Sequence, residues 1–456
     1  MAVVSSFKYS PLEKGSIRLL RVLPESTAED IRCQLIYMQL EAKSISSFAA
    51  LSYCWYDPTP VATITVNDQA LGIAQNLLDF LQNRFIYSKR MLSHDSETLK
   101  KNDLWIDAIC INQADDQEKS EQVQQMWKIY TMAPLVIAWL GKEKEFTKKA
   151  FFALNTRYVG KMTGKAPPEA FEKMIEEARE DIGKLSEDPY FTRTWITPEV
   201  ICSADRMMLH SGRHVTYLDS LYDFTALSKG TIGTQGSLRA RGKNGLTLAV
   251  EGLIYTLRRS REIVKAAMAN KMQMSEGINT LIACIMDNKT KECSDVRDKI
   301  FAFRGLPLAQ LFDSKETPLL EVDYSMTLDE VAVATLSYID KLDCMDNTRG
   351  GAYSQYAPFV VIGLFRVDIA AQEFREWVES RLQRNEEHGT VHFITRSCKK
   401  IDCSTRFFDR LLGNGVSDLT RILCCRFEDT DPSDIQKRFE QAKEKDRKQF
   451  SIFPLP

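Results

Sequence analysis

The sequence predicts an α/β fold, with a mostly parallel sheet flanked by helices and a larger, mostly helical region after it. Short runs of branched apolar residues alternate with amphipathic helical segments up to Gly141, which is typical of an α/β domain. From about residue 216 to 340 helical periodicity dominates instead. We therefore expect an α/β core at 1–141, a mostly helical region at 142–345 and a C-terminal region of unassigned role at 346–456, with strands near 200–215 as candidates to complete the core.

Five apolar runs before residue 74 predict strands. They are rich in Val, Ile, Leu and aromatic residues and occupy 17–23, 31–40, 48–55, 62–66 and 69–73. Asn67-Asp68 separates the last two and predicts a two-residue hairpin turn. A helix is expected at 74–85, and the polar residues 86–103 predict a solvated loop.

Residues 104–141 are the most specific stretch of the chain, LWIDAICINQADDQEKSEQVQQMWKIYTMAPLVIAWLG. The pattern predicts a strand at 104–109, a polar loop at 112–117 and a second strand at 135–140. The helix between them carries an apolar stripe of Val123, Met126, Trp127 and Tyr130. The simplest arrangement is two neighbouring parallel strands joined by a right-handed crossover helix.

The carboxyl edge of these two strands is the candidate site. Ligands of open α/β sheets bind beyond the carboxyl ends of the strands, and that edge would hold Cys110, Asn112, Gln113 and Glu118, with Gln122 flanking the apolar stripe of the helix. Ser52, Tyr53 and Trp55 end the third expected strand, so they either line the same crevice or pack in the core.

After residue 141 the pattern is mainly helical. Helices are expected at 150–158, 168–185, 277–286, 299–303, 327–342 and 426–450. Residues 200–201 and 207–210 are candidates for a short strand that returns to the first domain. Two polar clusters are expected to make ion pairs that hold domains together: one of Arg193, Trp195 and Glu199, and one of Asp295, Arg297 and Asp298.

Composition narrows the function classes. With 456 residues the chain is longer than a single hydrophobic core usually serves, so two domains are expected. Its 60 Lys and Arg and 62 Asp and Glu give a formal net charge of −2. That balance provides no electrostatic footprint for nucleic acid. The N-terminus lacks a leader pattern and no apolar run reaches the roughly 18 residues of a membrane span, so we expect a cytoplasmic protein.

No metal or resident cofactor is expected. The 11 Cys form no CxxC pair, which favours free buried thiols over zinc or disulfides. His210 and His214 have metal-pair spacing, but the Ser-Gly-Arg between them predicts a turn. The dinucleotide-binding motif GxGxxG does not follow any expected strand, and the P-loop motif GxxxxGK[ST] does not occur, so both kinds of nucleotide site are disfavoured.

The 104–141 stretch resembles the signature of the fungal heterokaryon incompatibility (HET) domain. Further stretches resemble the same family at 49–55, 76–85, 193–204, 294–306 and 322–335. Two positions depart from its pattern: Tyr56 stands where the family usually has Gly, and Pro198 where it usually has Gln. The resemblance implies a role in cell death when incompatible hyphae fuse, through an incompatibility partner protein or a self-oligomer.

HET domains in turn resemble TIR domains, some of which hydrolyse NAD with one glutamate on a helix after a central strand. Carried over by position, that residue is Glu118. NAD would then be a substrate, and one carboxylate would hold the ribose hydroxyls and offset the positive charge that develops as cationic nicotinamide leaves. The resemblance thus implies a TIR-like domain with NAD glycohydrolase activity, or a noncatalytic signalling or assembly module.

Each candidate also has a structural interpretation. Asp115 followed by Glu118 is a helix-start pattern, and Asp107 would bond loop amides. Cys110 without a neighbouring His fits a small buried apolar residue. Asn112 and Gln113 would bond either the loop backbone or a ligand amide. The sequence leaves these alternatives open.

Overall fold

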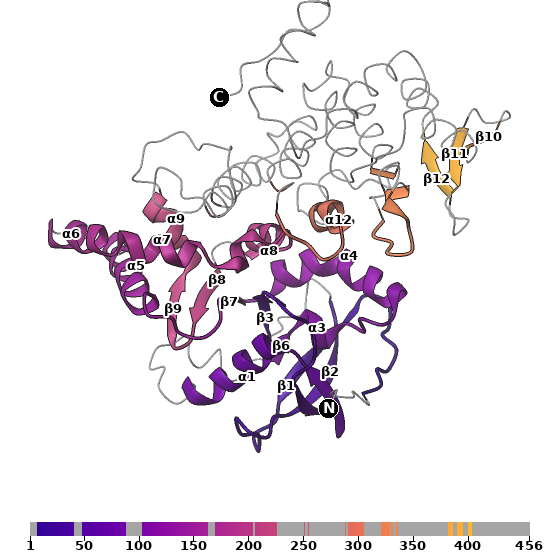
Figure 1. Ribbon diagram of the computed structural model, residues 1–456. Helices are drawn as coiled ribbons and strands as arrows, with labels where there is room; N and C mark the ends of the chain where they lie inside the picture. Colours follow the sequence, from indigo (N-terminus) through magenta and orange to yellow (C-terminus); the bar gives the residue numbers. More distant parts are fainter. Residues whose placement is uncertain are drawn as a thin grey trace, which may run out of the picture. The chain divides into compact units, whose positions relative to one another are not determined.

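A computed structural model of the chain describes two compact units (Figure 1). The described residues are 7–40, 48–87, 103–162, 169–203, 206–225, 250, 254, 288, 291–304, 321–328, 330, 331, 334, 335, 382–385, 390–394 and 400–403. One unit comprises Met1–Gln273 and Ala283–Tyr324, and the other Met274–Ile282 and Ser325–Pro456. Most of the expected 86–103 loop, the expected helices at 277–286 and 426–450, and most of 327–342 and 346–456 lie outside the described residues.

The first unit is built on a mixed nine-stranded sheet in the order β5-β4-β2-β1-β6-β3-β7-β8-β9. Its strands are β1 (Ser16–Val22), β2 (Arg32–Gln39), β3 (Phe48–Tyr53), β4 (Ala62–Val66), β5 (Gln69–Ile73), β6 (Asp103–Trp105), β7 (Leu135–Trp139), β8 (Met207–Ser211) and β9 (His214–Tyr217). The α/β class is confirmed. The expectation of a mostly parallel sheet is wrong, because the sheet is mixed. Its antiparallel pairs are β1 with β2, β4 with β5, β8 with β9, and β1 with β6.

Strand β3 forms the centre of this sheet. All six of its residues are buried, as expected of a strand covered on both faces. It pairs in parallel with β6 on one side and β7 on the other. The prediction that the strands at 104–109 and 135–140 are direct neighbours is therefore wrong. β3 lies between β6 and β7 because it pairs with both, and such long-range pairing is not visible in the local sequence pattern.

The strand predicted at 104–109 is also shorter than expected. β6 ends at Trp105, and a single helical turn, α3 (Asp107–Cys110), follows it. The Asp107 carboxylate accepts the Ala108 N–H at 2.8 Å, and the Cys110 N–H reaches the Ile106 carbonyl at 2.7 Å. A charged side chain that bonds its own following amide favours a turn over a buried strand.

Helix α4 (Asp116–Met132) follows the polar loop as expected. Asp115 caps it by accepting the N–H groups of Gln117 and Glu118 at 3.0 and 3.1 Å. Its buried face contains Val123, Met126, Ile129 and Tyr130, together with Gln122, whereas the expected Trp127 is only half-buried. Trp105 of β6 meets Tyr130 edge to face with ring centroids 5.6 Å apart, which fixes the helix on the sheet.

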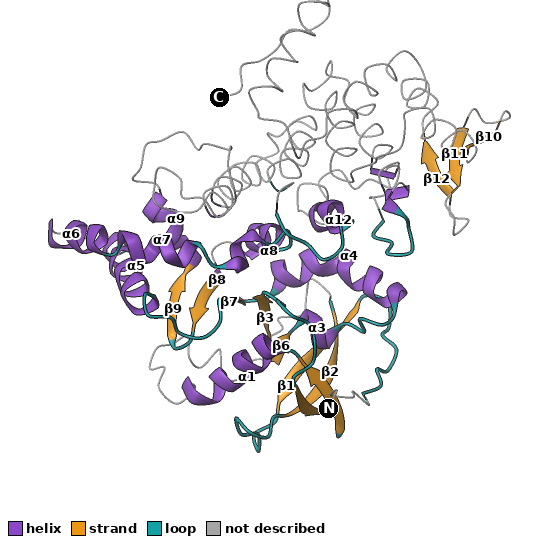
Figure 2. Cartoon of the chain, viewed as in Figure 1, coloured by secondary structure: helices purple, strands orange, loops and turns teal. Residues whose placement is uncertain are grey.

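The other described helices of the first unit flank this sheet or follow it in the chain (Figure 2). They are α1 (Gln75–Tyr87), α5 (Thr147–Met162), α6 (Glu169–Glu177), α7 (Arg179–Ser186), the 3-10 turn η1 (Pro189–Thr192), α8 (Ile196–Ser203), α9 (Leu218–Thr225) and α12 (Asp298–Arg304). The single helix predicted at 168–185 is divided into α6 and α7 at Ala178. Residues 200–201, expected as strand, lie in α8, which packs beside α4 (Figure 1).

Strands β8 and β9 add a hairpin to the edge of the sheet beyond β7. The turn expected between His210 and His214 is confirmed, with Gly212 at φ +53°. In the second unit, β10 (Leu382–Asn385), β11 (Thr390–Ile394) and β12 (Lys400–Cys403) form an antiparallel sheet. Among the described residues no helix has the length and apolarity needed to cross a bilayer, and no group of three His, Cys, Asp or Glu has metal-site geometry.

Candidate functional site at the carboxyl edge of the central strands

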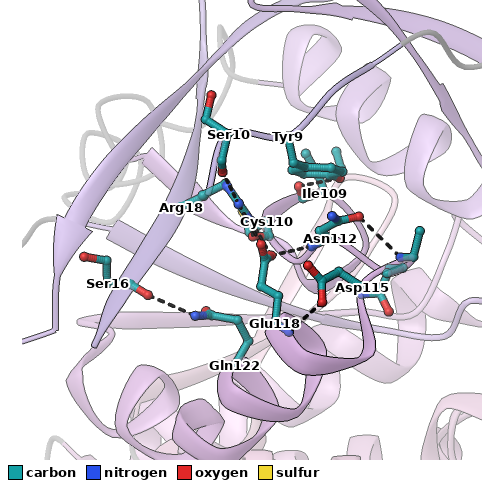
Figure 3. A network of polar contacts seen from close by, with 12 residues as sticks. Tyr9, Ser10, Ser16, Arg18, Ile109, Cys110, Asn112, Asp115, Glu118 and Gln122 are labelled. Carbon is teal, nitrogen blue, oxygen red and sulfur yellow. Dashed lines mark hydrogen bonds and ion pairs between the residues drawn. The ribbon is translucent and has the colours of Figure 1, made fainter. Parts of the chain in front are cut away.

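An ion pair between β1 and α4 dominates the candidate site (Figure 3). β1 runs antiparallel to β6 with Leu20 opposite Leu104, so Arg18 lies beside the turn that follows β6. Its Nη1 and Nη2 donate to the two carboxylate oxygens of Glu118 at 2.5 and 2.9 Å. The Arg18 side chain is 0% exposed and that of Glu118 is 11% exposed. This is a bidentate, nearly buried pair, the strongest geometry for a guanidinium and a carboxylate.

The loop between α3 and α4 completes the surroundings of Glu118. The Asn112 N–H donates to Glu118 Oε1 at 2.7 Å, and Arg18 Nη1 also donates to the Cys110 carbonyl at 3.1 Å. Burial opposes the charged form of Arg18, but the hydrogen bonds and charge of Glu118 outweigh it and raise the pKa of the guanidinium. In this arrangement the Glu118 carboxylate is an internal counter-ion with a protein donor on each oxygen.

Residues near the N-terminus cover the same pair. Arg18 Nη2 donates to the Ser10 carbonyl at 2.6 Å, and the Tyr9 ring lies 4.8 Å from the Arg18 guanidinium. The Tyr9 hydroxyl donates to the Ile109 carbonyl at 3.0 Å. The segment before β1 is thereby tied to α3, the helical turn that follows β6.

The other predicted residues of this loop make contacts within the protein. Gln113 donates to the Asp107 carbonyl at 2.9 Å, and the Asn112 side chain accepts the Ala114 N–H at 3.3 Å. Burial raises the pKa of the Cys110 thiol to about 12, so it stays protonated near neutral pH. Gln122 is buried and donates to the Ser16 carbonyl at 3.0 Å, which places it toward β1.

A second cluster brings together the ends of β3 and β6. Trp55 Nε1 donates to the two oxygens of Asp107 at 3.1 and 3.3 Å. Arg193, which precedes α8, donates to the Tyr53 carbonyl. Burial raises the pKa of Asp107, and the nearby charge of Arg193 opposes that effect. Two of the predicted site residues, Trp55 and Asp107, are therefore direct partners.

Ser52 belongs to a buried network beneath this cluster. Its hydroxyl donates to the Glu199 carboxylate and lies 2.6 Å from the Tyr190 hydroxyl. Burial raises the pKa of Glu199 to about 7, although Arg193 lowers it. The network joins β3 to η1 and α8, because Ser52 bonds Tyr190 in η1 and Glu199 in α8. The neighbouring Tyr53 is buried.

The comparisons with known proteins point to one family. Residues 48–199 match the family model described as "Heterokaryon incompatibility protein (HET)". Residues 48–199 are thus similar to the HET domain family. It is also 35% identical over 143 residues to "Heterokaryon incompatibility protein 6, OR allele" of Neurospora crassa, a match that covers 30% of this chain and 20% of that protein. This chain thus spans about a fifth of that relative, and no solved structure matches it.

The HET domain match includes β3, the 104–141 stretch and the Arg193–Glu199 segment, but it begins after β1. Arg18 and Tyr9 therefore contact the HET domain from outside the matched residues. Sequence reasoning missed both. The one signal for Arg18 was a charged residue inside the apolar run SIRLLRV, which requires a partner if the strand is buried. The sequence contains no signal that the partner is Glu118, 100 positions away.

Tyr56 stands at the position where the resemblance to the HET family predicts glycine. It adopts φ +50°, the left-handed region that glycine occupies at little cost. Its side chain is 50% exposed, and its hydroxyl lies 3.4 Å from the Asp188 carboxylate. The turn after β3 thus adopts a conformation that favours glycine, although Tyr56 occupies the position.

Proposed function

We propose that this chain is a cell-death effector of fungal heterokaryon incompatibility. The proposal rests on the HET domain at 48–199 and on the printed name of the Neurospora crassa relative. Because the match covers 20% of that relative, the proposal concerns the HET domain and extends to the chain only through it. The trigger would be an incompatibility partner protein or a second copy of the chain. The free thiols among the described cysteines suit a reducing compartment, so we propose the cytoplasm as the place of action.

The geometry supports a noncatalytic signalling or assembly module best. The observation that carries this choice is the occupancy of the Glu118 carboxylate: Arg18 holds both oxygens, and the Asn112 amide adds a third donor. A carboxylate that must bind ribose hydroxyls needs free lone pairs, and three of the roughly four lone-pair sites of Glu118 are already taken. In the described arrangement Glu118 instead secures α4 to β1, which stabilises the helix that an assembly surface would use.

A variant series in the fungal host tests this choice. Expressed chains carrying Arg18→Lys, Glu118→Gln and, as a control, Glu121→Gln on the exposed side of α4 are compared for cell death at matched abundance. A structural pair predicts that Arg18→Lys and Glu118→Gln weaken cell death to a similar extent. Loss of cell death with Glu118→Gln alone, at unchanged stability, contradicts the noncatalytic module.

NAD hydrolysis through Glu118 is the second candidate. It is favoured by the position of Glu118 in the first turn of α4, beyond the carboxyl end of β6, as in the TIR-like interpretation. In this reaction the bond between nicotinamide and the ribose carbon breaks, nicotinamide keeps the bonding electrons, and water adds to the carbon and loses a proton. Glu118 would hold the ribose hydroxyls and offset the positive charge of the transition state, once Arg18 has left it.

Nicotinamide release tests this second candidate. Purified chain at low and high concentration is incubated with NAD, beside a Glu118→Gln protein of measured thermal stability. Release that depends on Glu118 establishes hydrolysis and makes self-association its expected trigger. Absence of release at high concentration and after crosslinking rejects it. The transfer of NAD hydrolysis from TIR domains to this chain rests on an analogy of fold, and a shared fold does not determine function.

A further inference from the structure

We propose that Arg18 and residues 7–10 form an N-terminal latch that holds Glu118, and that a carboxylate or phosphate group of a ligand releases Glu118 by taking its place on Arg18 while residues 7–10 stay closed over the bound anion. The inference rests on the proposed function in that Glu118 lies in the HET domain whose activity the latch would control. The regulated group is Glu118, and the ligand that releases it carries a carboxylate or phosphate group.

Arg18 is the centre of the latch. Its Nη1 and Nη2 atoms make four hydrogen bonds, two to Glu118, one to the Cys110 carbonyl and one to the Ser10 carbonyl. The buried Nε has no acceptor among the described residues. Arg18 therefore holds Glu118 on one side and the N-terminal segment on the other, so the segment cannot leave without breaking bonds at the same guanidinium.

The fully buried guanidinium determines what can replace Glu118. A cation at a site with 0% side-chain exposure is strongly destabilised without a counter-charge. Neutral groups and water cannot provide that charge, so withdrawal of Glu118 without replacement is costly. A carboxylate or phosphate group restores it, because both offer two oxygens to the guanidinium fork.

The surroundings already supply donors for a bound anion. The Asn112 N–H donates to the Glu118 oxygen that also accepts from Arg18 Nη1, so it would face an oxygen of an anion bound in the same place. The Tyr9 ring lies near the guanidinium and its hydroxyl donates to the Ile109 carbonyl in α3, so Tyr9 and Ser10 cover Arg18 (Figure 3). Because Tyr9 and Arg18 precede the HET match, which begins at residue 48, the cover is contributed by a segment outside the matched domain.

Chemical rescue of a Glu118→Ala chain tests the site. The substitution removes one methylene and the carboxylate, a fragment that acetate replaces. Thermal unfolding of the full chain is followed against sodium acetate or sodium phosphate, with sodium chloride at equal ionic strength as the reference. We expect a saturable rise of about 3 °C with acetate or phosphate over chloride. The Arg18→Gln/Glu118→Ala double variant and a Glu121→Ala control should show no such rise.

Amide exchange of residues 7–10 tests the latch itself. In Glu118→Ala these amides should exchange at least about tenfold faster than in the unaltered chain, and acetate should restore the slow rate. An equal acetate effect in the double variant, no effect of either anion, or unchanged exchange at 7–10 would overturn the proposal. If Glu118→Ala does not fold, Glu118→Gln replaces it in the exchange measurement. Since neither readout uses cell death or NAD, a positive result together with no toxicity would reject the proposed function and retain the latch.

Discussion

The Ser52 hydroxyl donates a hydrogen bond to the Glu199 carboxylate, although 147 positions separate the two residues. The bond joins the central strand β3 to α8 at the place where Tyr190 also reaches Ser52. Glu199 is buried and its pKa is raised to about 7, so the proton on this carboxyl is part of the stability of the fold near neutral pH.

Replacement of Glu199 by Gln should change stability in a pH-dependent way. The folded pKa of about 7 exceeds the ordinary 4.5, so the stability that the protonated carboxyl contributes is complete below pH 4.5 and is lost as pH rises through 7. Glu199→Gln and the unaltered chain should be similar at pH 4.5, and the variant should be more stable by about 3 kcal/mol at pH 8.

Urea unfolding at both pH values checks this prediction, with the exposed Glu145→Gln as control. The difference between proteins is the informative quantity, because His210 also titrates. Burial lowers the pKa of His210 to about 4, so its contribution falls as pH drops from 6.5 through 4. A difference between Glu199→Gln and the unaltered chain that does not change from pH 4.5 to 8 contradicts the assignment.

Arg18→Gln should destabilise the protein far more than Arg21→Gln in the same strand. Arg18 is buried against Glu118, whereas Arg21 pairs with Asp103 with its own side chain 52% exposed. Removal of one partner from a buried pair costs about 3 to 5 kcal/mol, and loss of a surface pair less than about 1 kcal/mol. Chemical unfolding of both variants measures the two costs, and equal losses would show that burial of the Arg18 pair is energetically unimportant.

Tyr56→Gly should stabilise the turn after β3. A non-glycine residue at φ +50° carries about 1 kcal/mol of backbone strain that glycine does not. The hydroxyl contact to Asp188 is long, at 3.4 Å, and offsets little of this strain. Tyr56→Phe, which keeps the strain and removes the hydroxyl, is the control. Lower thermal stability of Tyr56→Gly than of Tyr56→Phe would mean that the aromatic side chain contributes more than the backbone loses.

Gly212→Ala should disrupt the β8–β9 hairpin turn. A Cβ at this position would lie 2.6 Å from Glu143 Cβ and 2.7 Å from the Glu143 backbone nitrogen, in addition to the strain of φ +53°. Gly15→Ala is a matched control, because it carries the strain of φ +80° but its nearest neighbour is the Gln39 side chain at 3.5 Å. We expect a loss of about 1 kcal/mol for Gly15→Ala and at least about twice that for Gly212→Ala. Calorimetric melting of both proteins measures these losses, and equal values would show that the backbone near Glu143 moves freely.

Local sequence signals were sufficient to predict most elements of the first unit. Branched apolar runs predicted its strands, Asn67-Asp68 predicted a hairpin that both residues confirm with positive φ, and Asp115 with its following apolar stripe predicted α4. These signals are local, because turn chemistry, helix caps and side-chain periodicity act over a few residues.

The strand order and the partners of the candidate residues depend on long-range contacts, which the sequence does not reveal. The insertion of β3 between β6 and β7, the Arg18–Glu118 pair and the Ser52–Glu199 bond all join residues far apart in sequence. The pattern around Asp115 and Glu118 showed a helix start, yet the carboxylate is held by an arginine from β1. The physical reason is that burial makes a charge require a counter-charge, while the identity of that counter-charge depends on which strands the complete chain brings together.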